Sequence, residues 1–135
     1  VRQPPGPRNA LGLVKFMFPN EHAIYLHDTP EKHLFERQSR TYSSGCIRLH
    51  RPFEFAYKLL APQTDDPEGL FHATLETGRE TRIDLQTPVP VHLIYRTAVP
   101  TAKGRVAFRS DIYGRDARLW EALAAKGVEI GAAGG

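Results

Sequence analysis

The alternation of hydrophobic and polar residues predicts a β-hairpin near the start of the chain. The first predicted strand spans residues 11–18 and has apolar residues at every second position, the period of a strand with one buried face. Three residues share that face: Val14, Phe16 and Phe18. A turn composition follows, and residues 23–27 form the second predicted strand. Its side chains alternate, with Ile24 and Leu26 on one side and Tyr25 and His27 on the other.

The rest of the chain predicts short helices and further strands. Thr29 and Pro30 suit the first positions of a helix that runs to about Glu36, and Pro52 opens a helix through Leu60. The next predicted elements are a helix at 68–76 and strands at 81–85, 90–97 and 105–108. Asp116 caps a last predicted helix, and Gly127 ends it. One stripe of this helix is apolar and carries Leu119, Trp120, Leu123 and Ala124. We therefore expect one mainly-β domain with short helices over residues 1–130 and a disordered tail over 131–135.

Length, charge and cysteine content narrow the possible functions. The 135 residues suit one domain, and the single cysteine excludes an internal disulfide framework and multi-cysteine metal motifs. No apolar run reaches the roughly 20 residues of a membrane helix, and the first residues lack the apolar region of a signal peptide. The net charge is only +3, and the basic residues are scattered, so no nucleic-acid partner is expected and anionic small substrates or envelope polymers fit as well.

Cys46 is the candidate nucleophile. Gly45 precedes it and allows a tight turn, in which successive backbone N–H groups converge on one point. Such a nest lowers the pKa of a thiol and forms an oxyanion hole for acyl transfer. Arg48 adds positive charge two residues further on. The alternative is that Cys46 is a small buried hydrophobic residue, as free cysteines often are.

His27 is the candidate general base. It ends a predicted strand that is close to Cys46 in the sequence, and a cysteine nucleophile needs a base and a third group that orients it. The other histidines are expected to be structural or solvated: His22, His33, His50, His72 and His92. None has a convincing metal-ligand spacing with a thiol or carboxylate, so we expect no metal and no cofactor.

Two stretches carry a resemblance to a known family. Residues 24–30, Ile-Tyr-Leu-His-Asp-Thr-Pro, followed by residues 40–48, Arg-Thr-Tyr-Ser-Ser-Gly-Cys-Ile-Arg, resemble the active-site signature of the L,D-transpeptidases with a YkuD-type catalytic domain. In that family a spacer of about a dozen and a half residues separates a histidine from a Ser/Thr-His-Gly-Cys segment, and here 18 residues separate His27 from Cys46.

The chain is most similar to the large periplasmic murein L,D-transpeptidases of Gram-negative bacteria, and the resemblance spans Gln3 to about Leu123. It rests on further motifs: Gln3-Pro4-Pro5-Gly6-Pro7, Asn9-Ala10-Leu11-Gly12, Lys15-Phe16, Phe18-Pro19-Asn20, Leu34-Phe35 and Asp111-Ile112-Tyr113-Gly114. It implies the β-sandwich or barrel-like fold of that catalytic domain. Relatives carry strands and a capping segment before the position of Val1, so the chain is expected to be the C-terminal portion of the domain, without its N-terminal strands.

The resemblance also implies roles for individual residues. Cys46 would be the acyl-accepting nucleophile, His27 the base, and the backbone carbonyl of Asp28 the third member, while the Asp28 side chain is expected to be a loop cap or surface carboxylate. The backbone N–H groups of Gly45 and Cys46 would form the oxyanion hole. No metal takes part.

The sequence departs from the commonest family pattern at two positions. Ser44 replaces the histidine that precedes the glycine, and Arg48 stands where the signature often has asparagine. Arg48 is either a clamp for a substrate carboxylate or a structural residue that holds the loop through backbone carbonyls. Ser44, Tyr25, Arg40 and Tyr42 are further candidates for the substrate site.

The implied reaction is a two-step acyl transfer in peptidoglycan, in the periplasm, for cell-wall biogenesis and cell shape. The thiol attacks the diaminopimelate carbonyl of a tetrapeptide stem and expels D-alanine, and an amine then attacks the thioester to form a 3→3 cross-link or an attachment to a lipoprotein. Carbapenems would acylate the same cysteine.

Two alternatives stay open. One is another cysteine peptidoglycan peptidase, although papain-like enzymes usually have the cysteine before the histidine. The other is a non-catalytic wall-binding domain.

Overall fold

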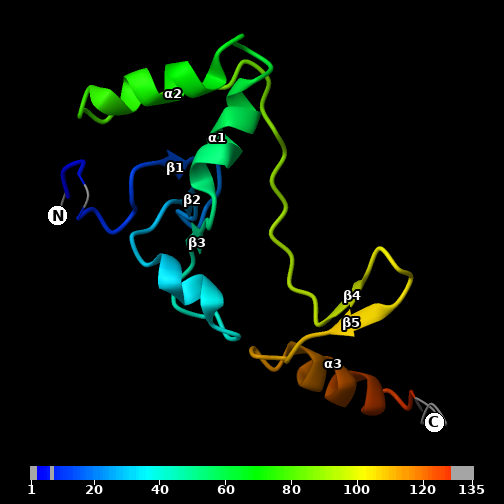
Figure 1. Cartoon of the computed structure of the whole chain (residues 1–135). Coiled ribbons are helices and arrows are strands. Elements are labelled where there is room, and N and C mark those ends of the chain that lie inside the picture. Colours follow the sequence, from blue (N-terminus) through cyan, green and yellow to red (C-terminus); the bar gives the residue numbers. More distant parts are fainter. Residues whose placement is uncertain (1–2, 7, 129–135) are drawn as a thin grey trace. The chain divides into compact units, whose positions relative to one another are not determined.

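A computed structural model describes residues 3–6 and 8–128, which form two compact units, Val1–Val91 and His92–Gly135 (Figure 1). The first unit contains three strands, a 3₁₀-helix and two α-helices, and the second contains two strands and one α-helix. The predicted tail at 131–135 lies outside the described residues. Among the described helices, none has the length and hydropathy required to cross a bilayer.

The first unit is built on a small mixed sheet. Its strands are β1 (Lys15–Phe16), β2 (Leu26–His27) and β3 (Ile47–Arg48), in the order β1-β2-β3. β1 and β2 are antiparallel, which confirms the predicted hairpin with shorter strands, whereas β2 and β3 are parallel. In this register His27 is paired with Lys15 on one side and with Arg48 on the other. The middle strand therefore carries His27 between two basic residues.

The predicted helices of the first unit form, but the predicted start of the first one at Thr29 and Pro30 is wrong, because Glu31 directly precedes it. They are the 3₁₀-helix η1 (Lys32–Glu36), α1 (Pro52–Leu60) and α2 (Pro67–Glu76). Pro52 occupies the first turn of α1, where its missing N–H costs no hydrogen bond. Asp66 caps α2 by accepting a hydrogen bond from the Gly69 N–H at 2.8 Å, so this helix starts one residue before the predicted Glu68.

The hydrophobic core of the first unit lies between α1 and α2 and extends to β1. Its buried residues are Ala56, Leu60 and Phe71, and the residues packed against them are Val14, Phe16, Phe53, Tyr57, Leu75, Ile83 and Leu85. The rings of Phe16 and Phe55 lie 4.9 Å apart, so β1 is packed directly on α1. This packing holds the sheet in place. It therefore also positions the loops of the candidate site, which continue from β2 and β3.

Two predicted strands are wrong. Residues 81–85 and 90–97 are extended but have no strand assignment in the described structure. Ile83 and Leu85 alternate because both pack on the α1–α2 core, so a period of two arises here from side-chain packing without a hydrogen-bonded neighbour. The predicted strand at 105–108 forms as β5 (Val106–Phe108), which pairs with β4 (Ala98–Pro100) in an antiparallel ladder.

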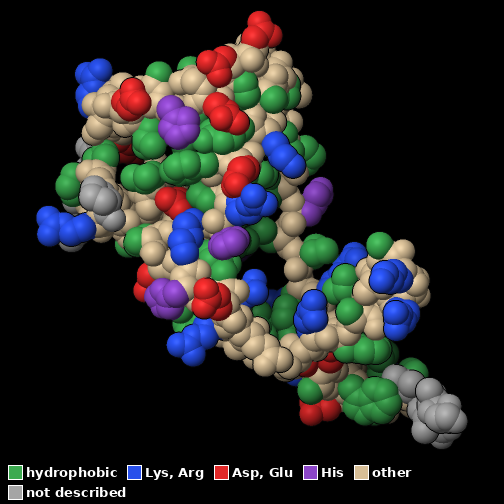
Figure 2. Space-filling model, in the orientation of Figure 1, with side chains coloured by type: hydrophobic (Ala, Val, Ile, Leu, Met, Phe, Trp, Pro, Cys, Tyr) green, Lys and Arg blue, Asp and Glu red, His purple; other side chains and the backbone are tan. Residues whose placement is uncertain are grey.

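The last helix, α3 (Arg115–Ala124), belongs to the second unit, and its predicted cap is wrong. The carboxylate of Asp111, not that of Asp116, accepts hydrogen bonds from the first backbone N–H groups of the helix, at 2.8–3.3 Å. Asp116 lies inside the first turn, where its charge favours the helix dipole. The predicted buried stripe is exposed, with Leu119 at 60% and Trp120 at 53%, and Figure 2 shows hydrophobic side chains at the surface of this unit. The sandwich or barrel-like arrangement stays a prediction.

Candidate active site

The parallel pairing of β2 and β3 brings the two candidate catalytic residues together. The Ile47 N–H donates to the carbonyl of Tyr25 at 3.0 Å, and the Leu49 N–H donates to the carbonyl of His27 at 2.8 Å. Cys46 immediately precedes β3 and therefore lies beside Tyr25. Because side chains alternate along a strand, residues two apart share a face. The chain thus places two pairs, Tyr25 with His27 and Cys46 with Arg48, on one side of the sheet.

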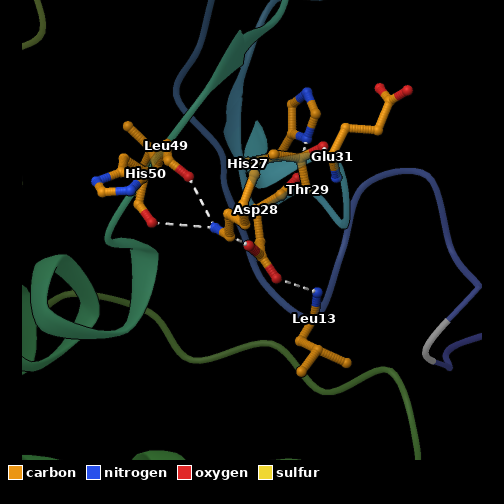
Figure 3. Close-up of polar contacts among 8 residues, drawn as sticks. Leu13, His27, Asp28, Thr29, Glu31, Leu49 and His50 are labelled. Atoms are coloured by element: carbon orange, nitrogen blue, oxygen red, sulfur yellow. Dashed lines mark hydrogen bonds and ion pairs between the residues drawn. The ribbon is translucent and has the colours of Figure 1, made fainter. Parts of the chain in front are cut away.

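His27 is buried, with 4% of its surface exposed, and its ring orientation is defined (Figure 3). Its Nδ1 makes a short hydrogen bond to the backbone carbonyl of Asp28. A carbonyl oxygen only accepts, so Nδ1 carries the proton and Nε2 of the neutral ring is free to take another. This tautomer is the one that a general base needs. The ring of Tyr25 contacts the imidazole edge-on, with ring centroids 6.0 Å apart.

The side chain of Asp28 is a buried brace, not a surface carboxylate. Its Oδ2 accepts a hydrogen bond from the Leu13 N–H at 3.0 Å, and its Oδ1 accepts one from Lys32 Nζ at 2.7 Å. Burial by itself raises the pKa of Asp28, but the hydrogen bonds from Lys32, Leu13 and the Thr29 N–H, together with the charge of Lys32, lower this pKa below its ordinary value. Gly12 has a φ of +65°, and a Cβ there would collide with this carboxylate.

Cys46 is half-buried and opens onto a cavity of about 460 Å³. The other residues that line the cavity are His22, Ala23, Ile24, Ser43, Ser44 and Gly45. Tyr25, the residue before β2, approaches the thiol. Burial raises the pKa of Tyr25, and the electrostatic interaction and hydrogen bond with Cys46 raise it further, against an opposing effect of Lys15. The phenol is therefore a neutral hydrogen-bond donor next to the sulfur.

Gly45 adopts a backbone conformation in which a residue with a side chain would be strained. Its φ of +156° is rarely adopted by residues with a side chain. Its N–H donates to Ser43 Oγ at 3.2 Å, so this N–H must exchange that bond to serve an oxyanion. The tight turn that the sequence predicts at Gly45 is therefore present directly before Cys46.

The opposite wall of the cavity is a turn that the sequence reasoning did not assign to the site. The side chain of Asn20 holds this turn with four hydrogen bonds: Nδ2 donates to the carbonyls of Phe18 and Ile24, and Oδ1 accepts from the N–H groups of His22 and Ile24. Ala23 has a φ of +53°, a conformation that is costly for a residue with a Cβ. The Pro-Asn pair before His22 is the sequence signal for this turn.

The other residues predicted to bind substrate do not all lie at the Cys46 cavity. Arg48 forms an ion pair with Glu31 at 3.0 Å, and its Nη1 is buried without a hydrogen-bond partner. Arg40 does not line the Cys46 cavity; it lines a second cavity of about 580 Å³, together with Lys32, His33, Phe35, Glu36 and His50. Tyr42 is 49% exposed. Of the predicted substrate residues, Ser44 and Tyr25 lie at the thiol.

The described residues contain no group of three or more histidine, cysteine, aspartate or glutamate side chains that could hold a metal ion. The site is therefore a thiol, an imidazole with a defined tautomer and a phenol beside an open cavity. This arrangement has the groups required for nucleophilic acyl chemistry.

Comparison with known proteins agrees with this geometry. Residues 1–91 match the model of the YkuD family, described as the L,D-transpeptidase catalytic domain, and this range coincides with the first compact unit. The chain belongs to this family. It is also similar to a Haemophilus influenzae protein named "Putative L,D-transpeptidase", with 37% identity over 119 residues. That alignment covers 88% of this chain and 24% of the relative, so the chain spans about a quarter of the length of this relative.

Proposed function

We propose that this chain carries the catalytic centre of a periplasmic L,D-transpeptidase that forms 3→3 cross-links in peptidoglycan through a thioacyl intermediate on Cys46. The observation that carries the proposal is the shared face of β2 and β3, which joins Cys46 to a histidine whose Nδ1 is bound by the Asp28 carbonyl. Membership of the YkuD family supports the same reaction class.

In the first step, His27 Nε2 takes the thiol proton, and the Cys46 sulfur attacks the carbonyl of diaminopimelate in a tetrapeptide stem. The backbone N–H groups of Gly45 and Cys46 are the proposed oxyanion donors. The imidazolium then protonates the amine of D-alanine as the peptide bond breaks, which leaves the thioester and the neutral base. The buried setting of His27 supports this role because water does not compete for its ring.

In the second step, the side-chain amine of a neighbouring stem enters the cavity next to Cys46. His27 removes a proton from this amine as it attacks the thioester carbonyl, and the thiolate leaves. A thioester suits this transfer because it retains acyl reactivity toward an amine. An amine of a lipoprotein would react in the same way, so the chemistry of the site accommodates both acceptors.

Acylation by a carbapenem tests the proposal directly. Cys46 is the single cysteine, so intact mass spectrometry after incubation with meropenem reports on this thiol. We expect one adduct on the wild-type chain and none on Cys46→Ala, with thermal unfolding of the variant near that of the wild type. A disaccharide-tetrapeptide substrate should then give a cross-linked dimer and D-alanine. An adduct on Cys46→Ala, or no adduct on the wild type, contradicts the proposal, and release of D-alanine with hydrolysis alone indicates a peptidase.

A further inference from the structure

We propose that Lys32 is a positioning residue for the catalytic base, acting on His27 through Asp28. The inference rests on the proposed function, since it assigns Lys32 a part in activating the same thiol. Sequence reasoning did not single out Lys32, although the acid and base lie four residues apart, a spacing that often forms an ion pair.

The ammonium group of Lys32 joins the loops that follow β2 and β3. Its Nζ donates to Asp28 Oδ1 at 2.7 Å, to the carbonyl of Leu49 at 3.0 Å and to the carbonyl of His50 at 3.1 Å. Figure 3 shows these three oxygens directed toward one point. An ammonium has three donors, so all of them are used here. Lys32 thus links the end of β2, which carries His27, to the end of β3, the strand that follows Cys46.

Asp28 transmits this restraint because each of its polar groups is bound. Its N–H donates to the carbonyl of Val14 at 2.8 Å, its carbonyl accepts from His27 Nδ1, and its carboxylate accepts from Lys32, Leu13 and the Thr29 N–H. The Thr29 N–H lies in the same peptide plane as the Asp28 carbonyl, so the carboxylate holds the plane that presents this carbonyl to His27. Without the ammonium the carboxylate loses one of these three donors, and the plane can rotate with the side chain.

The Lys32–Asp28 contact differs from an ordinary surface ion pair. The side chain of Asp28 is 9% exposed and that of Lys32 is 41% exposed, so the contact is shielded on the carboxylate side. Isolated pairs between exposed charges contribute little because water screens them. The lowered pKa of Asp28 supports the view that its charge is held by these donors.

Other charged and titratable groups around His27 must be considered in any measurement that depends on pH. Tyr25 contacts the ring, Cys46 lies beside Tyr25, and Lys15 and Arg48 are the register partners of His27 on β1 and β3. None of these residues bonds Asp28 in the contacts described above. A change that depends on Asp28 therefore separates the effect of Lys32 from theirs.

The pH profile of Cys46 alkylation by iodoacetamide is the deciding measurement. Only the thiolate reacts, so the rate reports how readily the thiol proton is removed. Lys32→Met should lower the rate at pH 7 by about tenfold or more relative to the wild-type chain. Lys32→Arg should lie between the two, because a guanidinium keeps the charge but cannot direct its donors to one point.

Gln63→Leu is the matched control. Gln63 also braces two loops, donating to the carbonyl of Asp84 at 3.1 Å and accepting from the Gln86 N–H at 3.0 Å, away from the thiol. Its loss should lower the thermal midpoint without changing the alkylation profile. If Lys32→Met fails to fold, Asp28→Asn decides, because it keeps the backbone carbonyl and removes the partner charge.

The outcomes separate the two proposals. No acylation of Cys46 by meropenem on the wild-type chain contradicts the proposed function. A wild-type alkylation profile that Lys32→Met leaves unchanged, or that Asp28→Asn leaves unchanged where Lys32→Met is unfolded, overturns the role of Lys32 alone. A shift in the double variant equal to that of either single variant supports action through Asp28.

Discussion

His27 bonds the backbone carbonyl of Asp28, its own neighbour in the chain, so the base and the group that orients it move together. In many cysteine enzymes a side chain from a distant segment has this role. Here the orientation depends on one peptide plane, whose Thr29 N–H bonds the Asp28 carboxylate, and Leu13 and Lys32 hold that carboxylate in place. The predictions that follow test this arrangement and its surroundings.

Removal of the base should slow acylation without unfolding the chain. We expect His27→Gln to lower the rate of meropenem acylation by a factor of roughly 10² to 10⁴, the range for a lost general base. His33→Gln, an exposed histidine on η1, is the matched control and should react like the wild type. Stopped-flow absorbance gives both rates. Equal rates for His27→Gln and the wild type would show that another group ionises the thiol.

Arg48 forms an ion pair with Glu31, and we predict a role in the loop rather than a role as a clamp. We expect Arg48→Lys to weaken this ion pair and to cost about 0.2–1 kcal/mol of unfolding free energy. Turnover of the peptide donor and alkylation by an uncharged electrophile should then fall in parallel. Glu31→Gln should have a smaller effect in the same direction, because Glu31 is half exposed. Selective loss of peptide turnover at an unchanged melting temperature would instead support the carboxylate clamp.

The lowered pKa of Asp28 predicts the direction of acid destabilisation. The folded chain keeps Asp28 ionised at a pH where the unfolded chain, with a pKa of about 3.9, already binds the proton. This contribution to stability is therefore present above about pH 4 and is lost as the pH falls through the lower folded pKa. Urea unfolding between pH 2 and 7 measures it.

Asp28→Asn should flatten that part of the acid dependence, whereas Asp65→Asn, in an exposed loop, should not change it. If both variants follow the wild-type curve below pH 4, Asp28 does not carry the linkage.

The Asn20 turn should affect both stability and the cavity. We expect Asn20→Ala to cost about 1–2 kcal/mol, because its hydrogen bonds hold Ala23 in a left-handed conformation. Acylation should slow, since the wall opposite Cys46 loses its support. Adding Ala23→Gly should recover part of the stability. Asn9→Ala removes a comparable brace from another turn and should lower stability without slowing acylation.

The sequence predicts the local parts of this site better than its long-range parts. The hairpin, the start of α1 at Pro52 and the turn at Gly45 follow from periodicity, proline and glycine, which act within a few residues. The pairing of β2 with β3 does not follow in this way, because parallel register depends on contacts between strands that 19 residues separate. The strand end at His27 makes it a candidate base for Cys46, and the resemblance assigns both residues to one site.

Other features were missed because their cause is tertiary. Lys32 and Asp28 have the four-residue spacing of an ion pair, but the two backbone carbonyls that complete the contact belong to Leu49 and His50, which follow β3. His22 was assigned to a solvated turn, since nothing local shows that this turn forms a cavity wall. Residues 81–85 alternate like a strand because helices, not strands, receive their side chains.

The connection between β2 and β3 has a further consequence for how the chain can vary. Every side chain from Glu36 to Tyr42 is exposed, while the groups that fix the base and the thiol lie before and after that stretch. Doubling the length of a flexible loop costs only about 0.6 kcal/mol of closure entropy. The stretch can therefore lengthen, acquire a substrate-recognising insert or be exchanged between homologues, while the distance between sulfur and imidazole is set elsewhere.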